Sequence, residues 1–308
     1  MALRLEDLHA PRIDFGNGIE LSFELEEYTD TAAIGKASRE LRETPDKVTA
    51  SVAELRALIR AEQGLRVPLD KDAFLVRFLR PNKYQADSTF EMMKGYYRMK
   101  ARENFILDNL STESIKNALE DRVVQVLPKR DQHGCRIIYK EMGAKWNCSR
   151  VSSVEMIRAT NTLMEMIGRE PRTQLHGIVF VINFDKLSLS HIGQFSPKFI
   201  KSIVDFGQKQ APYRIKGIHI VNNARMFNIL FKLFRPFLGK KWSQRIFVHG
   251  ADRQSLHAHI DAACLPSFLG GTYEMLPEYD GAVVGQLLDC YKDVLEESNQ
   301  YGYAVEEK

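Results

Sequence analysis

The side chains that can perform acid–base or nucleophilic chemistry do not fall into the spacings that such chemistry needs. Asp185 follows the most apolar run of the chain, where α/β proteins often carry functional groups, but no nucleophile or base is recognisable beside it. The sequence also lacks a glycine-rich phosphate loop, a G-x-S-x-G nucleophile elbow and an H-E-x-x-H metal motif. We therefore expect no catalytic residues and no cofactor.

Metal chemistry is equally unsupported by the histidines and cysteines. His257 and His259 are two residues apart in an expected helix, so they point away from each other and do not make an i, i+4 pair. His219 and His249 fall in expected strands, where each reads as a core histidine. The cysteines lack C-x-x-C spacing and read as reduced thiols of a cytosolic protein; they are Cys135, Cys148, Cys264 and Cys290.

One segment combines apolar surface with positive charge. Between residues 224 and 245, Phe227, Phe231 and Phe234 recur at the spacing of one helical face, and a second apolar row lies beside it. The segment is too apolar for an ordinary surface helix. It is also too short and too charged to span a bilayer, which takes roughly 20 apolar residues.

The charge around this segment is local. From Phe206 to Ala251 there are nine Lys or Arg residues and no Asp or Glu, whereas the whole chain has 43 basic and 40 acidic residues. Two interpretations remain open: a helix that binds an anionic membrane surface, or a core helix whose basic side chains reach water. Nucleic acid is disfavoured as a partner, because the aromatic residues lie at helical core spacing and form no stacking platform.

The rest of the chain has the composition of an ordinary globular protein, with 44% hydrophobic and 27% charged residues. We expect no secretory signal, because the first residues include acidic side chains and no apolar run. Residues 1–44 are polar and mixed. We expect them to be a weakly structured lead-in with one short helix near 30–42.

Residues 45–120 read as a small helical bundle. Thr44 and Pro45 suggest an N-cap and a first helical position, and this helix is expected to stop near Gly64. A second helix fits 71–80. A third is expected from Asp87, as its N-cap, to about residue 102.

From residue 121 the pattern changes to an α/β alternation. Residues 178–182 are apolar without alternation, which indicates a strand buried on both faces of a parallel sheet. Long crossovers between the runs favour a parallel or mixed sheet. The expected strands are 136–139, 177–184, 218–221 and 246–249, and the expected helices are 151–168, 197–210, 224–238, 252–260 and 280–297.

Three stretches resemble the CRAL-TRIO lipid-binding family. They are DKDAFLVRFLRPNKY (70–84), YRIKGIHIVNNARMFNILFKLFRPFLGKKWSQRIFVHG (213–250) and SLHAHIDAACLPSFLGGTY (255–273). The resemblance covers roughly 45–280 and is strongest to the branch of α-tocopherol transfer protein, cellular retinaldehyde-binding protein and the clavesins. It implies a helical N-terminal module at 45–120, a lipid-binding α/β domain with a mixed, mostly parallel sheet at 121–280, and a C-terminal helix and tail at 281–308.

The family fold implies an apolar pocket closed by a mobile gate helix, here about 222–235. Thr160 is polar on an otherwise apolar face, which suits a pocket in which few polar groups orient a ligand. Plain core packing is the competing account of each apolar position. The pocket residues that the resemblance implies are Ile157, Thr160, Met164, Ile178, Ile182, Phe195, Ile203, Phe206, Ile218, Phe227 and Phe231.

The resemblance also implies a phosphoinositide site beside the gate. Lys83 is an additional candidate there, because Asn82 stands where the family usually has an arginine. The four cations that match the family are Arg214, Lys216, Lys241 and Arg245.

Together these features predict a non-enzymatic, monomeric cytoplasmic carrier. It would bind one hydrophobic lipid, such as a retinoid or tocopherol, and exchange it on endosomal or other phosphoinositide-bearing membranes. Two alternatives stay open: a phosphoinositide-binding trafficking adaptor, and an α/β enzyme that acts on lipids. The absent nucleophile elbow argues against the enzyme.

Overall fold

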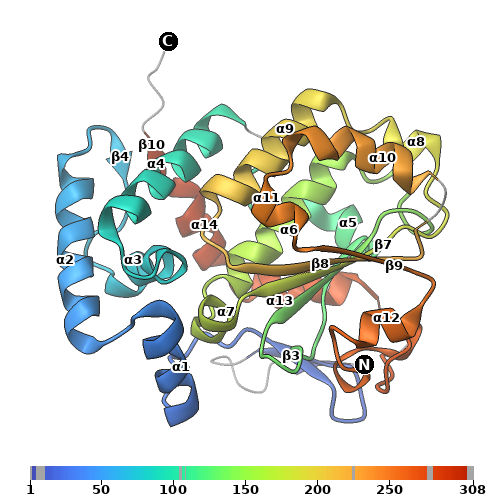
Figure 1. Ribbon diagram of the computed structural model, residues 1–308, viewed down its shortest axis with the longest axis horizontal. Helices are drawn as coiled ribbons and strands as arrows, with labels where there is room; N and C mark the ends of the chain where they lie inside the picture. Colours follow the sequence, from blue (N-terminus) through green and yellow to red (C-terminus); the bar gives the residue numbers. More distant parts are fainter. Residues whose placement is uncertain are drawn as a thin grey trace.

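The computed structural model has a helical part beside an α/β part that is built around one sheet (Figure 1). The residues that the structure describes are 2–4, 11–103, 106–107, 109–223, 226–275 and 280–303.

Three helices make up most of the helical part: α2 (Pro45–Ala61), α3 (Asp72–Leu79) and α4 (Ala86–Arg102). The Thr44 hydroxyl accepts a hydrogen bond from the Lys47 backbone N–H at 3.3 Å, so the first helix begins as its sequence indicates.

The expected N-cap of the third helix is wrong. α4 begins at Ala86 with Gln85 as its N-cap, two residues before the expected cap, and Asp87 lies in its first turn. An acidic side chain in the first turn still interacts favourably with the helix dipole, which explains why Asp87 resembled a cap.

The α/β part contains a five-stranded sheet in the order β5-β6-β7-β8-β9. The short strand β5 (Val124–Val126), which the sequence did not predict, runs antiparallel to its neighbour. The other strands are mutually parallel, which confirms the mostly parallel α/β fold. They are β6 (Arg136–Glu141), β7 (Ile178–Asn183), β8 (Ile215–Val221) and β9 (Ile246–Gly250).

Helices lie over both faces of this sheet (Figure 1). The face that matters for the site is covered by α6 (Ser153–Ile167), α9 (Pro197–Asp205) and α10 (Phe227–Phe234). The shorter helices of this part are α5 (Lys116–Glu120), α7 (Pro171–His176), α8 (Leu189–Ile192), α11 (Lys240–Ser243) and α12 (Arg253–His257).

Two of the long expected helices are interrupted. The helix expected over 197–210 ends as one π-helical turn, Phe206–Gln210. The helix expected over 224–238 is regular only from Phe227 to Phe234 and then tightens into a 3₁₀ turn, where Pro236 lacks a backbone donor. Positions 224 and 225, which that expectation included, lie outside the described residues.

The expectation of a weakly structured lead-in is wrong for its described residues. β2 (Arg12–Asp14) and β3 (Glu20–Ser22) form an antiparallel hairpin, and β1 (Ala2–Arg4) pairs with β2. Ile13 and Leu21 are completely buried in the core of the α/β part. Their alternation with polar neighbours around a glycine-rich turn is a hairpin signal that composition alone concealed.

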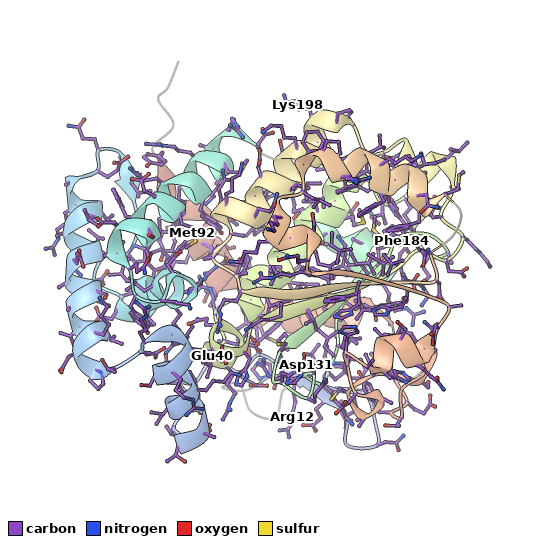
Figure 2. The ribbon with its side chains drawn as sticks, in the orientation of Figure 1. Arg12, Glu40, Met92, Asp131, Phe184 and Lys198 are labelled. Carbon is purple, nitrogen blue, oxygen red and sulfur yellow. The ribbon has the colours of Figure 1, made fainter. Side chains whose placement is uncertain are left out.

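The short helix expected near 30–42 forms as α1 (Thr31–Leu41). The Asp30 carboxylate caps it by accepting a hydrogen bond from the Ala33 N–H at 2.8 Å. Ala37 and Leu41 pack against Leu175 of α7. This packing brings the end of α1, including Glu40, against the α/β part (Figure 2).

The end of the chain forms two helices where the sequence predicted one. α13 (Ala282–Asp289) packs against α5 and β2, and α14 (Lys292–Gln300) follows it. The strand β10 (Gly302–Tyr303) then pairs with β4 (Leu65–Arg66) of the helical part. The C-terminal segment therefore connects both parts of the molecule.

Candidate functional site

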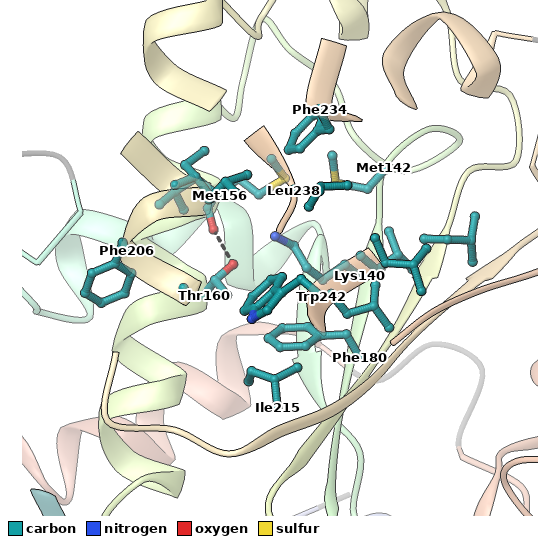
Figure 3. Close-up of a pocket in the computed structure, with 18 of the residues that line it drawn as sticks. Lys140, Met142, Met156, Thr160, Phe180, Phe206, Ile215, Phe234, Leu238 and Trp242 are labelled. Carbon is teal, nitrogen blue, oxygen red and sulfur yellow. Dashed lines mark hydrogen bonds between the residues drawn. The ribbon is translucent and has the colours of Figure 1, made fainter. Parts of the chain in front are cut away.

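A cavity of about 250 Å³ lies between the sheet and the helices α6, α9 and α10 (Figure 3). Its described lining is almost entirely aliphatic and aromatic. The polar side chains of the lining are those of Lys140, Thr160, Asn161, Tyr213 and Trp242. Small-molecule sites typically combine such apolar walls with a few placed polar groups.

The floor of the cavity is a consequence of strand alternation. Phe180 and Ile182 of β7 are two residues apart, so both side chains face the helices. Ile218 and Ile220 of β8 pair with them in register and continue the same surface. The floor is therefore apolar across the middle of the sheet.

The helix α6 forms one wall of the cavity. Met156, Ile157, Thr160 and Met164 all line it, at spacings that place them on one helical face. The Thr160 hydroxyl donates to the Met156 carbonyl at 2.8 Å, so its proton is used within the helix. Only its acceptor capacity is left for the cavity.

The helix α10 covers the cavity with its apolar face. Phe227 and Leu230 are 5% and 3% exposed, and the ring of Phe227 lies 5.1 Å from that of Phe184, the residue that follows β7. Phe234 makes an edge contact with Phe195 at 5.9 Å. On its outer side, Ile229 remains 42% exposed. The helix is thus apolar on both the cavity side and part of the solvent side.

Ten of the eleven expected pocket residues line this cavity, and Ile178 does not. Ile178 has the strand parity of Phe180 but is the first residue of β7, next to a register shift against β8, and is packed at 1% exposure in the core. The ten lining residues are Ile157, Thr160, Met164, Ile182, Phe195, Ile203, Phe206, Ile218, Phe227 and Phe231.

Sequence reasoning missed Lys140, the one charged residue in the described lining. It is 8% exposed, and burial lowers the pKa of its ammonium group to about 8. The strand pattern contained the signal, because Lys140 is two residues from the buried Ile138 in a strand with one face toward the helices.

Two of the expected cations, Arg214 and Lys216, lie beside an acidic residue that partly neutralises them. Arg214 donates to Glu40 at 2.9 Å, and the Lys216 amine lies 3.8 Å from the same carboxylate. Burial alone would raise the pKa of Glu40, but the hydrogen bonds from Arg214 and Lys36 outweigh it and lower that pKa to about 2. The local sequence window suggested unopposed charge at Arg214 and Lys216, and the fold corrects this.

The other expected cations differ in setting. Arg245 donates to the Ile215 carbonyl at 2.5 Å, and burial together with the charge of Arg214 lowers its pKa. Lys241 is exposed on α11. Lys83 is exposed in the helical part, and no contact among the described residues joins it to the others. The neighbouring Asn82 side chain donates to the Phe78 carbonyl at 3.2 Å.

The histidines expected in the core are there. His219 Nδ1 lies 3.0 Å from His249 Nε2, and His249 Nδ1 lies 2.8 Å from the Ser255 hydroxyl. Burial and the neighbouring His249 lower the pKa of His219 to about 3. Within the described ranges no His, Cys, Asp and Glu side chains gather into a metal-binding group. Nor does any described helix combine the length and hydropathy needed to cross a membrane.

Comparison with known proteins yields consistent matches. The CRAL/TRIO domain matches residues 120–271. The human protein named alpha-tocopherol transfer protein-like is 34% identical over 240 residues, which is 78% of this chain and 70% of that protein. Rat clavesin-1 is 32% identical over 249 residues, covering 80% of this chain and 69% of the relative.

Rat clavesin-2 is 32% identical over 273 residues, which is 88% of this chain and 82% of the relative. Among solved structures, the crystal structure of Sfh5 matches with a TM-score of 0.43 and 11% identity, covering 88% of this chain and 100% of that chain. The identities above 30% over most of the chain, together with the domain match, confirm the resemblance: this chain belongs to the CRAL/TRIO family.

Proposed function

We propose that the protein carries one hydrophobic lipid, such as a retinoid or tocopherol, and exchanges it at phosphoinositide-containing membranes. The observation that carries this proposal is the apolar cavity between the sheet and α6, α9 and α10. The names of its relatives, which include a transfer protein-like protein, support the same activity. The protein would act as a monomer in the cytoplasm, with transient residence on endosomal membranes, and without catalysis.

Apolar burial supplies the binding energy in this proposal. Removing about 400 Å² of ligand surface from water contributes roughly 10 kcal/mol at about 25 cal/mol per Å², before the ordering costs of binding. Apolar walls of this kind can therefore hold a lipid chain without a charged contact. Movement of one wall would ease the entry and release of that lipid.

The helix α10 is the wall that we propose to move. It is short and ends at the 3₁₀ turn around Pro236, and Asn222, shortly before it, has a left-handed backbone with φ of 49°. These two sites interrupt the regular structure on either side of the helix. Outward movement would expose Phe227 and Leu230, which water disfavours and a bilayer accepts.

Positive charge beside α10 supports docking on an anionic membrane. Lys232, Arg235, Lys240 and Lys241 are exposed there. Each cation near an anionic surface contributes about 1 kcal/mol. Arg214 and Lys216 would contribute less than free cations, because Glu40 already interacts with both.

Native mass spectrometry tests the carrier proposal directly. Full-length protein is incubated with retinoid, tocopherol and phospholipid panels, and we expect a complex with one lipid. Ile203→Trp fills the cavity from α9 and should abolish loading, whereas Lys198→Trp, on the exposed side of the same helix, should not. Failure of the wild-type protein to retain any lipid would refute the proposal.

A further inference from the structure

Lys140 is the cavity residue that a purely hydrophobic ligand does not explain. In β6 it pairs with Ile182 of β7, and its side chain extends from the sheet into the cavity (Figure 3). The adjacent Glu141 faces the other side of the sheet, where its carboxylate accepts a hydrogen bond from the Asn183 amide at 3.1 Å. Strand alternation therefore aims Lys140 at the site and keeps the nearest carboxylate away from it.

The ammonium group of Lys140 is buried without compensation. It has no ion pair or hydrogen bond to any described residue, and its side chain is at 8% exposure. The described lining contains no carboxylate and no histidine. A buried charge without a partner is costly, and an apolar residue of similar volume would stabilise the folded chain instead. Lys140 thus weakens the fold at the place where a ligand would bind.

Two of the other polar groups of the cavity, Thr160 and Asn161, already donate hydrogen bonds within the protein. Thr160 donates to the Met156 carbonyl, and the Asn161 amide nitrogen donates to the Ile106 carbonyl at 2.5 Å. The Tyr213 hydroxyl accepts a hydrogen bond at 3.4 Å from Arg77, which lies outside the cavity lining, and both Tyr213 and Trp242 are neutral. Lys140 is consequently the charged donor that this site presents to a ligand.

We propose that the cavity selects a lipid with a terminal carboxylate, whose oxygens bind the Lys140 ammonium group while the hydrocarbon chain lies under α10. This inference rests on the carrier function and narrows its ligand class. A neutral hydroxyl accepts one hydrogen bond but leaves the charge unbalanced. A carboxylate supplies both an opposite charge and several acceptor sites, so it removes the cost of the buried cation.

A series with one chain and three head groups tests the assignment. Full-length protein is titrated with oleic acid, oleyl alcohol and methyl oleate, and binding is followed by tryptophan fluorescence, since Trp242 lines the cavity. We expect the acid to bind at least about tenfold more tightly than the alcohol or the ester, as a charged hydrogen bond predicts.

Three variants locate the preference. Lys140→Met keeps the volume and should bring the acid-to-alcohol ratio close to one, because it removes the charged partner of the carboxylate. Lys140→Arg should retain the preference for the acid. The matched control Lys145→Met removes an exposed lysine from the loop after the same strand and should leave the ratio unchanged.

The outcomes separate this inference from the function on which it rests. Equal affinity for all three lipids, or an unchanged preference in Lys140→Met, would overturn the carboxylate assignment and leave the carrier intact. Binding of none of them, together with no lipid in native mass spectrometry, would overturn both. A last experiment incubates the protein with retinal and cyanoborohydride, which reduces an imine between the aldehyde and a lysine to a stable amine. Such an adduct at Lys140, without a preference for the acid, would overturn the carboxylate assignment and indicate that Lys140 binds aldehydes.

Discussion

Arg77 and Glu165 form a buried bidentate ion pair that joins the helical part to the α/β part. Arg77 Nη1 donates to Glu165 Oε1 at 2.7 Å, a second bond runs from Nη2 to Oε2, and the two side chains are 5% and 3% exposed. Ser298 of α14 also donates to Glu165 at 2.7 Å. Because Glu165 lies on α6, the helix that walls the cavity is held by the neighbouring part of the molecule.

Removing one member of this pair should destabilise the fold. Glu165→Gln leaves the Arg77 guanidinium buried without a counter-charge, and we expect a loss of about 3–5 kcal/mol in the free energy of unfolding. Urea denaturation measures it. The control is Glu120→Gln in the exposed pair with Arg150, which should cost about 1 kcal/mol or less. Equal midpoints for the two variants would contradict a buried, uncompensated charge.

The same pair predicts a loss of stability in acid. Burial would raise the pKa of Glu165, but the charge of Arg77 outweighs it and lowers that pKa to about 2. Since the folded pKa lies below the unfolded value of about 4.3, the stabilisation is complete above that value and is lost as the pH falls toward 2. Urea midpoints at pH 6, 4 and 3 should fall more steeply for the wild type than for Glu165→Gln. If the urea midpoints of the wild type and Glu165→Gln fall equally with pH, Glu165 does not cause the loss of stability in acid.

Charge reversal at Lys241 distinguishes a carrier from an adaptor. Lys241→Glu changes the net charge at the membrane-facing surface by two units. This should weaken binding to phosphoinositide vesicles by about 2 kcal/mol, or roughly thirtyfold. A carrier should still load its lipid and lose the membrane-stimulated transfer, measured between vesicles. Lys47→Glu, on the exposed surface of α2, should change neither property. Transfer that survives Lys241→Glu would argue against docking through this surface.

The exposed apolar residue of α10 should contribute to membrane docking. Ile229→Ser removes an apolar side chain that is 42% exposed, and we expect vesicle binding to weaken roughly fivefold, or about 1 kcal/mol, with loading unchanged. Ile34→Ser makes the same change at a 50% exposed position of α1 and serves as the control. If both variants bind vesicles like the wild type, the outer face of α10 does not enter the bilayer.

Binding of a lipid carboxylate should depend on pH through Lys140. Burial lowers the pKa of this ammonium group to about 8, so its charged form is lost as the pH rises through that value. Tyr213, the other titratable group of the described lining, has a pKa raised by burial above its ordinary range. Affinity for oleate should therefore fall between pH 7 and pH 10, whereas affinity for oleyl alcohol stays constant. Lys140→Met should abolish the difference between the two curves.

The pocket residues were implied by the family resemblance, and local geometry explains why most of them share one surface. Ile182 and Ile218 face the cavity by strand alternation, and Phe227 and Phe231 lie on one helical face, because these patterns fix which side a residue takes. The end of a strand is less well defined by the same rule. Ile178 shares a parity with Ile182 but lies beyond the cavity floor, which depends on how the strands stagger.

Contacts between segments far apart in the sequence could not be predicted from local hydrophobic periodicity or local charge. Glu40 is 174 residues from Arg214, and only the packing of α1 on α7 places the two side chains together. The local window around Arg214 therefore overstated the free positive charge. Lys140 was missed for a different reason: a lysine in a strand is ordinarily assumed to be solvated, and its burial depends on helices far away in the sequence.

The pairing of β10 with β4 has a mechanical consequence. It ties the end of the described chain to the helical part, while the Lys100 amine holds the carbonyls of Ser298 and Tyr301 at 2.8 and 2.6 Å. A rotation of the helical part away from the α/β part would have to break these attachments as well as the contacts between the two parts. The lipid should accordingly enter and leave by a local opening in the α/β part, while the helical part and the α/β part keep their relative orientation.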